Sequence, residues 1–259
     1  MSDSALILAN PPIVEAVLDL DCDLPPSIDF ASLQDAVKNT YQDRYPKFRP
    51  VFFQETKIES KLDAPPEMSV RGGIQAFQCF DKTDKQLVQV RAQGYSFNRL
   101  APYTSMDDYL PEIERTWNLF VKVMSPVQVR VVRLRYINRI LLPLKNGRVD
   151  LKRYLKMNLR PADGKLKMTG FLNQYAAVEK ETGHEVNVVV TSQPPDNNRL
   201  PIIFDNCVAS VANVQPQEWN WILAKIQSLR DLKNRVFKNT LTDTCLNLFQ
   251  QSDSASSGT

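Results

Sequence analysis

The sequence is poor in the residues on which most enzyme sites depend. Its 259 residues include one histidine, His184, and only eight glycines, where average usage of about 7% would give roughly 18. Histidine-bound metals, histidine-activated nucleophiles and glycine-rich phosphate loops need residues that this chain lacks, and no GxSxG, HExxH, Walker or GxGxxG motif occurs. His184 itself falls in an expected hairpin turn, where we expect a surface residue. The sequence predicts a protein that is not an enzyme, with no catalytic residue, cofactor or metal.

Cysteine is scarce and widely spaced. The four thiols, at Cys22, Cys79, Cys207 and Cys245, show no CxxC or similar metal-binding spacing. They indicate reduced structural cysteines, as in a cytosolic protein. Long apolar runs are also absent, since none approaches the ~18–20 residues of a membrane span, and the first ten residues lack the basic start of a secretory signal. We therefore expect a cytoplasmic protein with no membrane contact.

Positively and negatively charged residues are nearly equal in number. Thirty-two Lys and Arg residues against 29 Asp and Glu residues give a net charge of +3. A dedicated binder of duplex DNA usually carries a stronger and more clustered positive charge. The balance disfavours such a protein but leaves room for a local basic patch.

Strand and helix patterns alternate along the chain in the order β-α-β-β-β-α, twice. Apolar and acidic residues alternate with a period of two over 13–24, which predicts a half-buried strand. Apolar positions at helical spacing predict long helices over 104–124 and 217–249, the second interrupted near Thr240 or Thr242. We expect an α+β fold with a curved, mainly antiparallel sheet and the long helices packed on one face, as in TATA-binding-protein-like or helix-grip folds. The domain prediction is a tail over 1–10, a first half over 11–125, a second half over 126–249 packed as one unit with the first, and a disordered tail over 250–259.

The most informative polar pattern is QLVQVRAQGYSFNR at 86–99. Taken as one strand, it places Gln89, Arg91, Gln93, Tyr95, Phe97 and Arg99 on a single face. Guanidinium and aromatic groups together are typical of a recognition surface, and the same mixture could stack nucleobases. The alternative is that Tyr95 and Phe97 pack in the core and the remaining residues form a solvated face.

A second pattern, VVRLRYINR at 131–139, places Arg133, Arg135 and Arg139 on one strand face. Three arginines would repel one another unless carboxylates or bound anions lie opposite. An acidic stripe on the first strand could pair with them if the two strands are neighbours, at roughly 0.2–1 kcal/mol per pair. The other interpretation is a site for an anion or an acidic protein; a metal site is disfavoured, since carboxylates on alternate strand positions do not close a coordination shell. The stripe consists of Glu15, Asp19, Asp21 and Asp23.

Three segments carry a resemblance to a known family. They are NPPIVEAV at 10–17, the block 94–143 that contains FNRLAPY and LRYINRI, and LRDLKNRVFKNTLTDTCLNLF at 229–249. Together they resemble a sporadically distributed family of uncharacterised prokaryotic proteins of about 250 residues. The resemblance implies no catalytic residues; it suggests a mobile or defence-associated locus, a CRISPR-associated accessory protein being one member of this kind.

The resulting hypothesis is a non-enzymatic accessory or regulatory protein that binds another protein of the same locus. The alternative is a single-stranded nucleic-acid-binding protein that uses an aromatic and arginine sheet face. A homodimer through the last helix stays open, because its near-heptad apolar stripe would serve a coiled coil or a core equally well. The expected partner-binding residues are Arg91, Tyr95, Phe97, Arg99, Arg133, Arg135 and Arg139.

Overall fold

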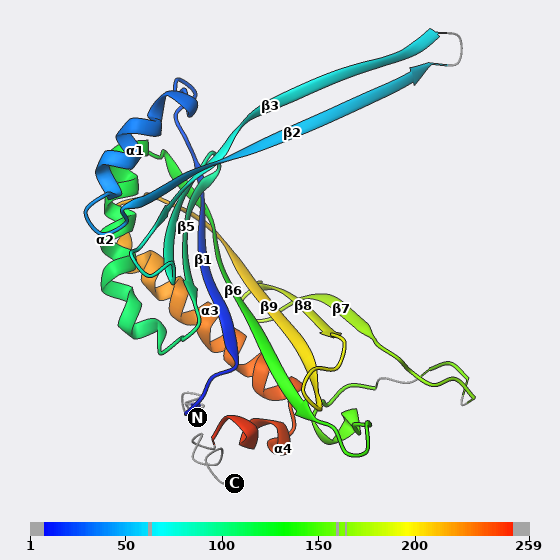
Figure 1. Cartoon of the computed structure of the whole chain (residues 1–259). Coiled ribbons are helices and arrows are strands. Elements are labelled where there is room, and N and C mark those ends of the chain that lie inside the picture. Colours follow the sequence, from blue (N-terminus) through cyan, green and yellow to red (C-terminus); the bar gives the residue numbers. More distant parts are fainter. Residues whose placement is uncertain (1–7, 62–63, 159–160, 164, 251–259) are drawn as a thin grey trace.

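The computed structural model describes residues 8–61, 64–158, 161–163 and 165–250. Within them, nine strands form one antiparallel sheet in the order β2-β3-β4-β5-β1-β6-β9-β8-β7 (Figure 1). The expected α+β class with a mainly antiparallel sheet is confirmed, and the expected tails lie mostly outside the described residues. The strands are β1 (Ile13–Asp23), β2 (Lys47–Lys61), β3 (Ala64–Phe80), β4 (Gln86–Arg91), β5 (Gly94–Leu100), β6 (Gln128–Pro143), β7 (Leu172–Val178), β8 (Glu185–Ser192) and β9 (Arg199–Val214).

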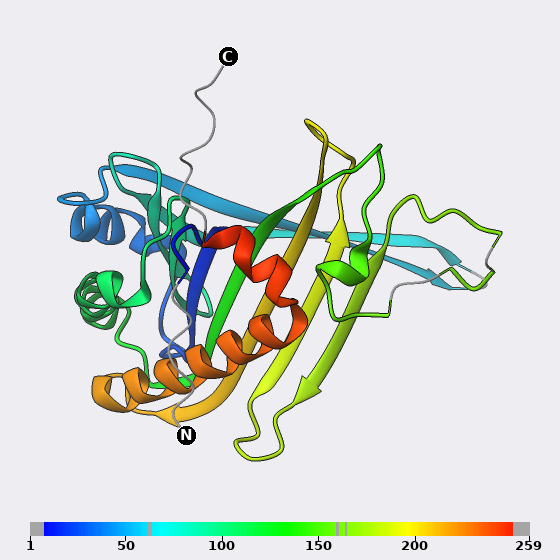
Figure 2. The same cartoon turned by 90° about the horizontal axis from the view of Figure 1, so that it is seen from below.

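The helices cover one face of this sheet. In Figure 2, α3 and α4 lie in front of the strands. Each long helix turns the apolar side chains expected from its spacing toward the strands: Trp117 and Phe120 of α2 and Ile226 of α3 have no exposed surface. We call the other side of the sheet, which no described helix covers, the open face. The helices are α1 (Gln34–Tyr41), α2 (Met106–Met124), α3 (Trp219–Thr240) and α4 (Asp243–Leu246), with short 3-10 turns η1 (Ala31–Leu33), η2 (Leu151–Arg153) and η3 (Asn247–Phe249).

The central strand β1 shows how the sequence pattern builds the two faces. Its even-numbered residues from Ala16 to Cys22 are buried on the helix side, while the acidic residues between them point to the open face. β1 lies between β5 and β6 and pairs with both in antiparallel register. The acidic stripe therefore runs down the middle of the open face, directly beside the arginines of β6.

The predicted single strand over 86–99 is wrong. The chain turns after Arg91, and β4 and β5 form a hairpin in which Arg91 pairs with Gly94 and Gln89 with Ser96. The turn shifts the alternation by one residue, so that even-numbered residues of β5 share a face with odd-numbered residues of β4. Ser96 therefore lies beside Gln89 on the open face. Tyr95 and Phe97 point to the opposite side, where they are 0% and 3% exposed.

Two further predictions concern His184 and the last helix. The prediction that His184 is a surface residue is wrong, because its side chain is 2% exposed. Its Nε2 lies 2.9 Å from the Ser228 hydroxyl of α3. The break in the last helix is confirmed: Thr242 caps α4 by accepting a hydrogen bond from the Cys245 backbone N–H.

One hairpin leaves the body of the protein. β3 pairs with β4 only from Ala76 to Phe80, whereas β2 and β3 stay paired out to Lys61 and Ala64. Residues 52–61 of β2 and 64–74 of β3 therefore have no other strand beside them, and we call this two-stranded extension the arm. The arm projects well beyond the sheet (Figure 1) and passes behind it, opposite α3 and α4, when the molecule is seen from below (Figure 2). It thus projects on the side of the open face.

Candidate functional site

The arginines of the open face are paired with carboxylates of neighbouring strands. Asp21 of β1 lies between two of them: Arg91 Nη2 is 2.8 Å and Arg133 Nη1 is 3.1 Å from its carboxylate oxygens. Asp19 accepts a hydrogen bond from the Ser96 hydroxyl and lies 3.6 Å from Arg91 Nη2. Burial alone would lower the pKa of the Arg133 guanidinium, but Asp21 and Asp19 outweigh it and the pKa is raised.

The remaining arginines of β6 also have partners. Arg135 makes a two-pronged contact with Asp205 of β9, with Nη2 2.6 Å and Nε 3.0 Å from the carboxylate oxygens. Arg139 Nη2 lies 3.7 Å from an Asp196 oxygen, a looser and more exposed pair. The prediction that Arg133, Arg135 and Arg139 share one face is confirmed. The conditional prediction that the acidic stripe pairs with these arginines is confirmed only for Arg133, which contacts Asp19 and Asp21 across the neighbouring strands β1 and β6.

The other three expected site residues lie on the helix side of the sheet. Tyr95 packs against Trp117 and Phe120 of α2, with ring centroids 5.6 and 5.7 Å apart. Phe97 is also covered, and the Arg99 guanidinium lies 5.2 Å from the Tyr109 ring centroid of α2. The structure therefore brings Arg91 together with the β6 arginines, but it separates Tyr95, Phe97 and Arg99 from them. Neither buried ring is placed to stack on a nucleobase.

The shared carboxylate of Asp21 gives the first testable prediction. Asp21→Asn leaves two mostly buried arginine side chains, 21% and 33% exposed, without their nearest charge partner, so we expect it to lower the free energy of unfolding by about 1–2 kcal/mol. The matched control is Asp23→Asn on the same strand, since Asp23 pairs with Arg130 where both side chains are about half exposed. We expect a loss below about 0.5 kcal/mol there. Urea unfolding measures both, and equal losses would contradict the shared role of Asp21.

The arm presents apolar side chains on one of its two faces. Cross-strand partners share a face, and the register pairs Phe52 with Ile74 and Thr56 with Val70, while Met68 lies two residues from Val70 on the same side. Phe52, Met68 and Val70 are 67%, 70% and 54% exposed. We call this the apolar arm face; the opposite face carries Glu55 directly across from Arg71, and also Phe53, which is 45% exposed.

A close contact between Gly73 and the ring of Phe53 lies at the root of the arm. Gly73 lies opposite Phe53 on the polar side, and a Cβ added at Gly73 would lie 3.1 Å from the Phe53 ring. The ring therefore covers the glycine backbone. A register shift between Val51 and Phe52 marks the point where the arm leaves the sheet, as β-bulges commonly bend and twist a strand.

The open face also contains a hollow, of about 560 Å³, on the side away from the arm's root. Arg133 and Cys207 lie at one side of it, and Val178 of the edge strand β7 lies at the other. Val178 is 63% exposed. The open face thus combines compensated charge at its centre with apolar side chains toward β7.

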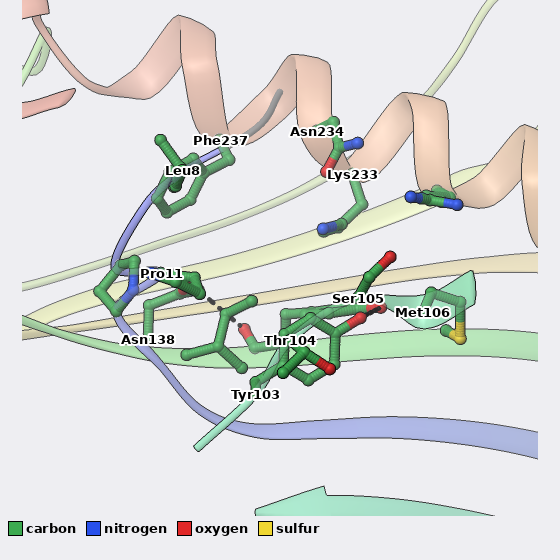
Figure 3. A pocket seen from close by; sticks show the side chains of 14 residues that line it. Leu8, Pro11, Tyr103, Thr104, Ser105, Met106, Asn138, Lys233, Asn234 and Phe237 are labelled. Carbon is green, nitrogen blue, oxygen red and sulfur yellow. Dashed lines mark hydrogen bonds between the residues drawn. The ribbon is translucent and has the colours of Figure 1, made fainter. Parts of the chain in front are cut away.

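A smaller pocket lies on the helix side, between α3 and the start of α2. Figure 3 shows Lys233 projecting from α3 toward the segment 103–106. Its Nζ is 3.8 Å from the centroid of the Tyr136 ring, and the Tyr103 and Tyr136 hydroxyls lie 3.0 Å apart. The pocket has a volume of about 160 Å³.

Burial shifts the pKa of the pocket lysine and the pKa of the buried cysteines in opposite directions. Burial raises the pKa of Cys22, Cys79 and Cys245 to about 12, so these thiols are protonated at neutral pH and poor nucleophiles. Burial, and to a lesser extent Arg230, lower the pKa of Lys233 to about 7. Across the described part of the chain, no three His, Cys, Asp or Glu residues are grouped as metal ligands.

Sequence reasoning missed both the apolar arm face and Lys233. A signal for each exists. Lys233 follows Leu229 by four residues and precedes Phe237 by four, which puts a lysine within the apolar stripe of α3. In the arm, Met68, Val70 and Phe52 follow the strand period of two, but the sequence alone does not say that no other element covers them.

Comparisons with protein families, curated proteins and solved structures find no match for this chain. They leave the resemblance to uncharacterised prokaryotic proteins a prediction. None of the helices in the described ranges has both the length and the apolar surface that a membrane crossing requires.

Proposed function

We propose that this protein is a non-enzymatic accessory or regulatory protein that binds another protein through the arm and the open face. The observation that carries the proposal is the apolar arm face, where Phe52, Met68 and Val70 are more than half exposed. A two-stranded hairpin is marginally stable by itself in water, and contiguous exposed apolar side chains are typical of interaction surfaces. We expect the arm to insert into an apolar cleft of the partner.

The open face has the properties expected of the periphery of the same interface. Its arginines Arg91, Arg133 and Arg135 are already paired with carboxylates, so they add little net charge for a strongly charged partner. Such compensated charges favour register and selectivity over affinity. The buried positions of Tyr95 and Phe97 remove the stacking surface on which single-stranded nucleic-acid binding would depend, and we propose protein binding instead.

Site-specific cross-linking tests the proposal. A photoreactive amino acid replaces Phe52 or Val70 on the apolar arm face, or Val127 as a control, which is 53% exposed but lies outside the arm and before β6. Irradiation in cells of the source organism should give a cross-linked product to the same second protein from positions 52 and 70. No such product should appear from position 127.

Paired substitutions then test the face of the arm. Phe52→Ser with Val70→Ser should weaken binding of the purified cross-linked partner at least about tenfold, since hydrophobic anchors dominate interfaces. Arg71→Ser, on the opposite face of the same arm, should leave it nearly unchanged. A cross-link between two copies of this chain, or equal loss from both variants, would contradict the proposal.

The two-half organisation is part of the same proposal. The predicted order β-α-β-β-β-α is not repeated, because in the described residues the first half has five strands and the second has four, with only the turn η2 between β6 and β7. In each half the first strand nevertheless lies beside the last one, β1 beside β5 and β6 beside β9, which supports two similar halves in a TATA-binding-protein-like or helix-grip-like sheet. We further propose that the protein acts in the cytoplasm as the product of a prokaryotic defence or stress-response locus, with CRISPR-associated loci as one setting. The resemblance of FNRLAPY and LRYINRI supports this setting.

A further inference from the structure

The pocket between α3 and α2 contains a lysine whose charge has no carboxylate partner among the described residues. Lys233 Nζ lies over the Tyr136 ring, and none of the ion pairs found involves it. The second cation of the pocket, Arg230, is already paired, since Asp107 holds it with two contacts of 2.7 and 3.0 Å. The pocket therefore carries one uncompensated positive charge.

The pocket also has a hydrogen-bond donor to offer. The Tyr103 and Tyr136 hydroxyls bond to each other, which uses one of their two protons. Because burial raises the pKa of both phenols, both protons are present at neutral pH. The second proton can be donated to a ligand oxygen.

The pocket is small and the rest of its lining is mixed, with the polar side chains of Thr104, Ser105, Asn138, Arg230 and Asn234 beside apolar ones. The N-terminal segment contributes Leu8, Pro11 and Ile13, and the helices contribute Met106 and Phe237. Typical ligand pockets occupy about 300–1,000 Å³, so a volume of about 160 Å³ suits a ligand much smaller than a nucleotide. At roughly 30 Å³ per water-sized group, it holds about five or six non-hydrogen atoms.

We infer that this pocket binds a short aliphatic carboxylate, with its negative charge at the Lys233 ammonium and its hydrocarbon end against Leu8 and Phe237. One positive charge matches a monoanion better than a phosphate dianion. A carboxylate also accepts two hydrogen bonds at once, one from the ammonium and one from the free tyrosine proton. The inference is independent of the arm and its partner, since the pocket lies on the helix side of the sheet.

Calorimetric titration with sodium butyrate, at equal ionic strength in sodium chloride and at about pH 6, tests the inference. Lys233 is then mostly protonated, and Arg230, Asp107, Tyr103 and Tyr136 around it keep their charge states. We expect butyrate to bind the unmodified protein at least about tenfold more tightly than the Lys233→Met variant. The double variant Tyr103→Phe with Tyr136→Phe, which keeps the charge and removes both hydroxyls, should weaken binding about threefold.

The matched control is Lys225→Met, two turns earlier on α3. The Lys225 Nζ lies 5.1 Å from the Trp221 ring centroid, so it makes a similar contact outside the pocket. This variant should bind butyrate like the unmodified protein. Equal losses at both lysines, no binding to the unmodified protein, or equally tight binding of sulfate, which is a dianion at pH 6, would each overturn the assignment.

Discussion

Gly94→Ala should lower the free energy of unfolding by about 4 kcal/mol or prevent folding altogether. Gly94 begins β5 with φ +141°, and a Cβ there would lie 2.1 Å from the Leu20 carbonyl oxygen and 2.9 Å from Asp21 Cα. These are backbone atoms of the central strand, which no change of rotamer can move away. Urea unfolding followed by circular dichroism measures the loss.

A second glycine separates the steric effect from the backbone effect. Gly147 also has positive φ, +69°, but nothing lies within 4 Å of an added Cβ. Gly147→Ala should cost only the strain of the left-handed conformation, about 1 kcal/mol. If both variants lose the same free energy of unfolding, the close approach of Gly94 to β1 is not the reason that glycine is required at position 94.

Gly94 also explains why the sequence misled at its most informative stretch. Alternation over 86–99 is continuous when the residues are counted by twos, and QG within it is a weak turn signal. Because the chain reverses at Ala92 and Gln93, directly before Gly94, the alternation continues on β5 shifted by one residue. The faces are then set by cross-strand pairing, which places Tyr95 beneath α2 and leaves Arg91 on the open face.

Other parts of the fold could be predicted because their signal is local. The period-two pattern of β1 and the helical spacing in α2 each reflect one buried face, and the observed burial follows both. The pairing of β1 with β6 joins segments far apart in the sequence. The sequence could therefore predict the ion pairs of Asp21 only on the condition that these two strands are neighbours. The arm illustrates the opposite limit: its apolar face follows strand alternation, but exposure depends on the absence of any covering element.

Lys233→Met should stabilise the protein, by about 2 kcal/mol near neutral pH. A fall of the lysine pKa from 10.5 to about 7 corresponds to an upper limit of roughly 5 kcal/mol. The side chain keeps part of its surface exposed, so we expect less than half of that limit. Methionine fills a similar space without a charge to desolvate. Thermal and urea unfolding without added carboxylate measure the gain, with Lys225→Met as the control that should change little.

The pH dependence of this gain identifies its cause. Between about pH 7 and 10.5, the unfolded chain holds a proton on Lys233 that the folded protein has released, so the contribution of this group to stability rises with pH. The penalty is complete below about pH 7 and absent above about pH 10.5. The three thiols with a pKa of about 12 act in the opposite direction above pH 9, but they do so equally in both proteins.

The difference between Lys233→Met and the unmodified protein should therefore shrink steadily from pH 7 to 10.5. A constant difference across that range would mean that methionine stabilises by packing alone. A destabilised variant at pH 7 would mean that the ammonium gains more from the Tyr136 ring than burial costs it. Butyrate should reduce the difference at about pH 6, because a bound carboxylate stabilises only the protein that retains the lysine.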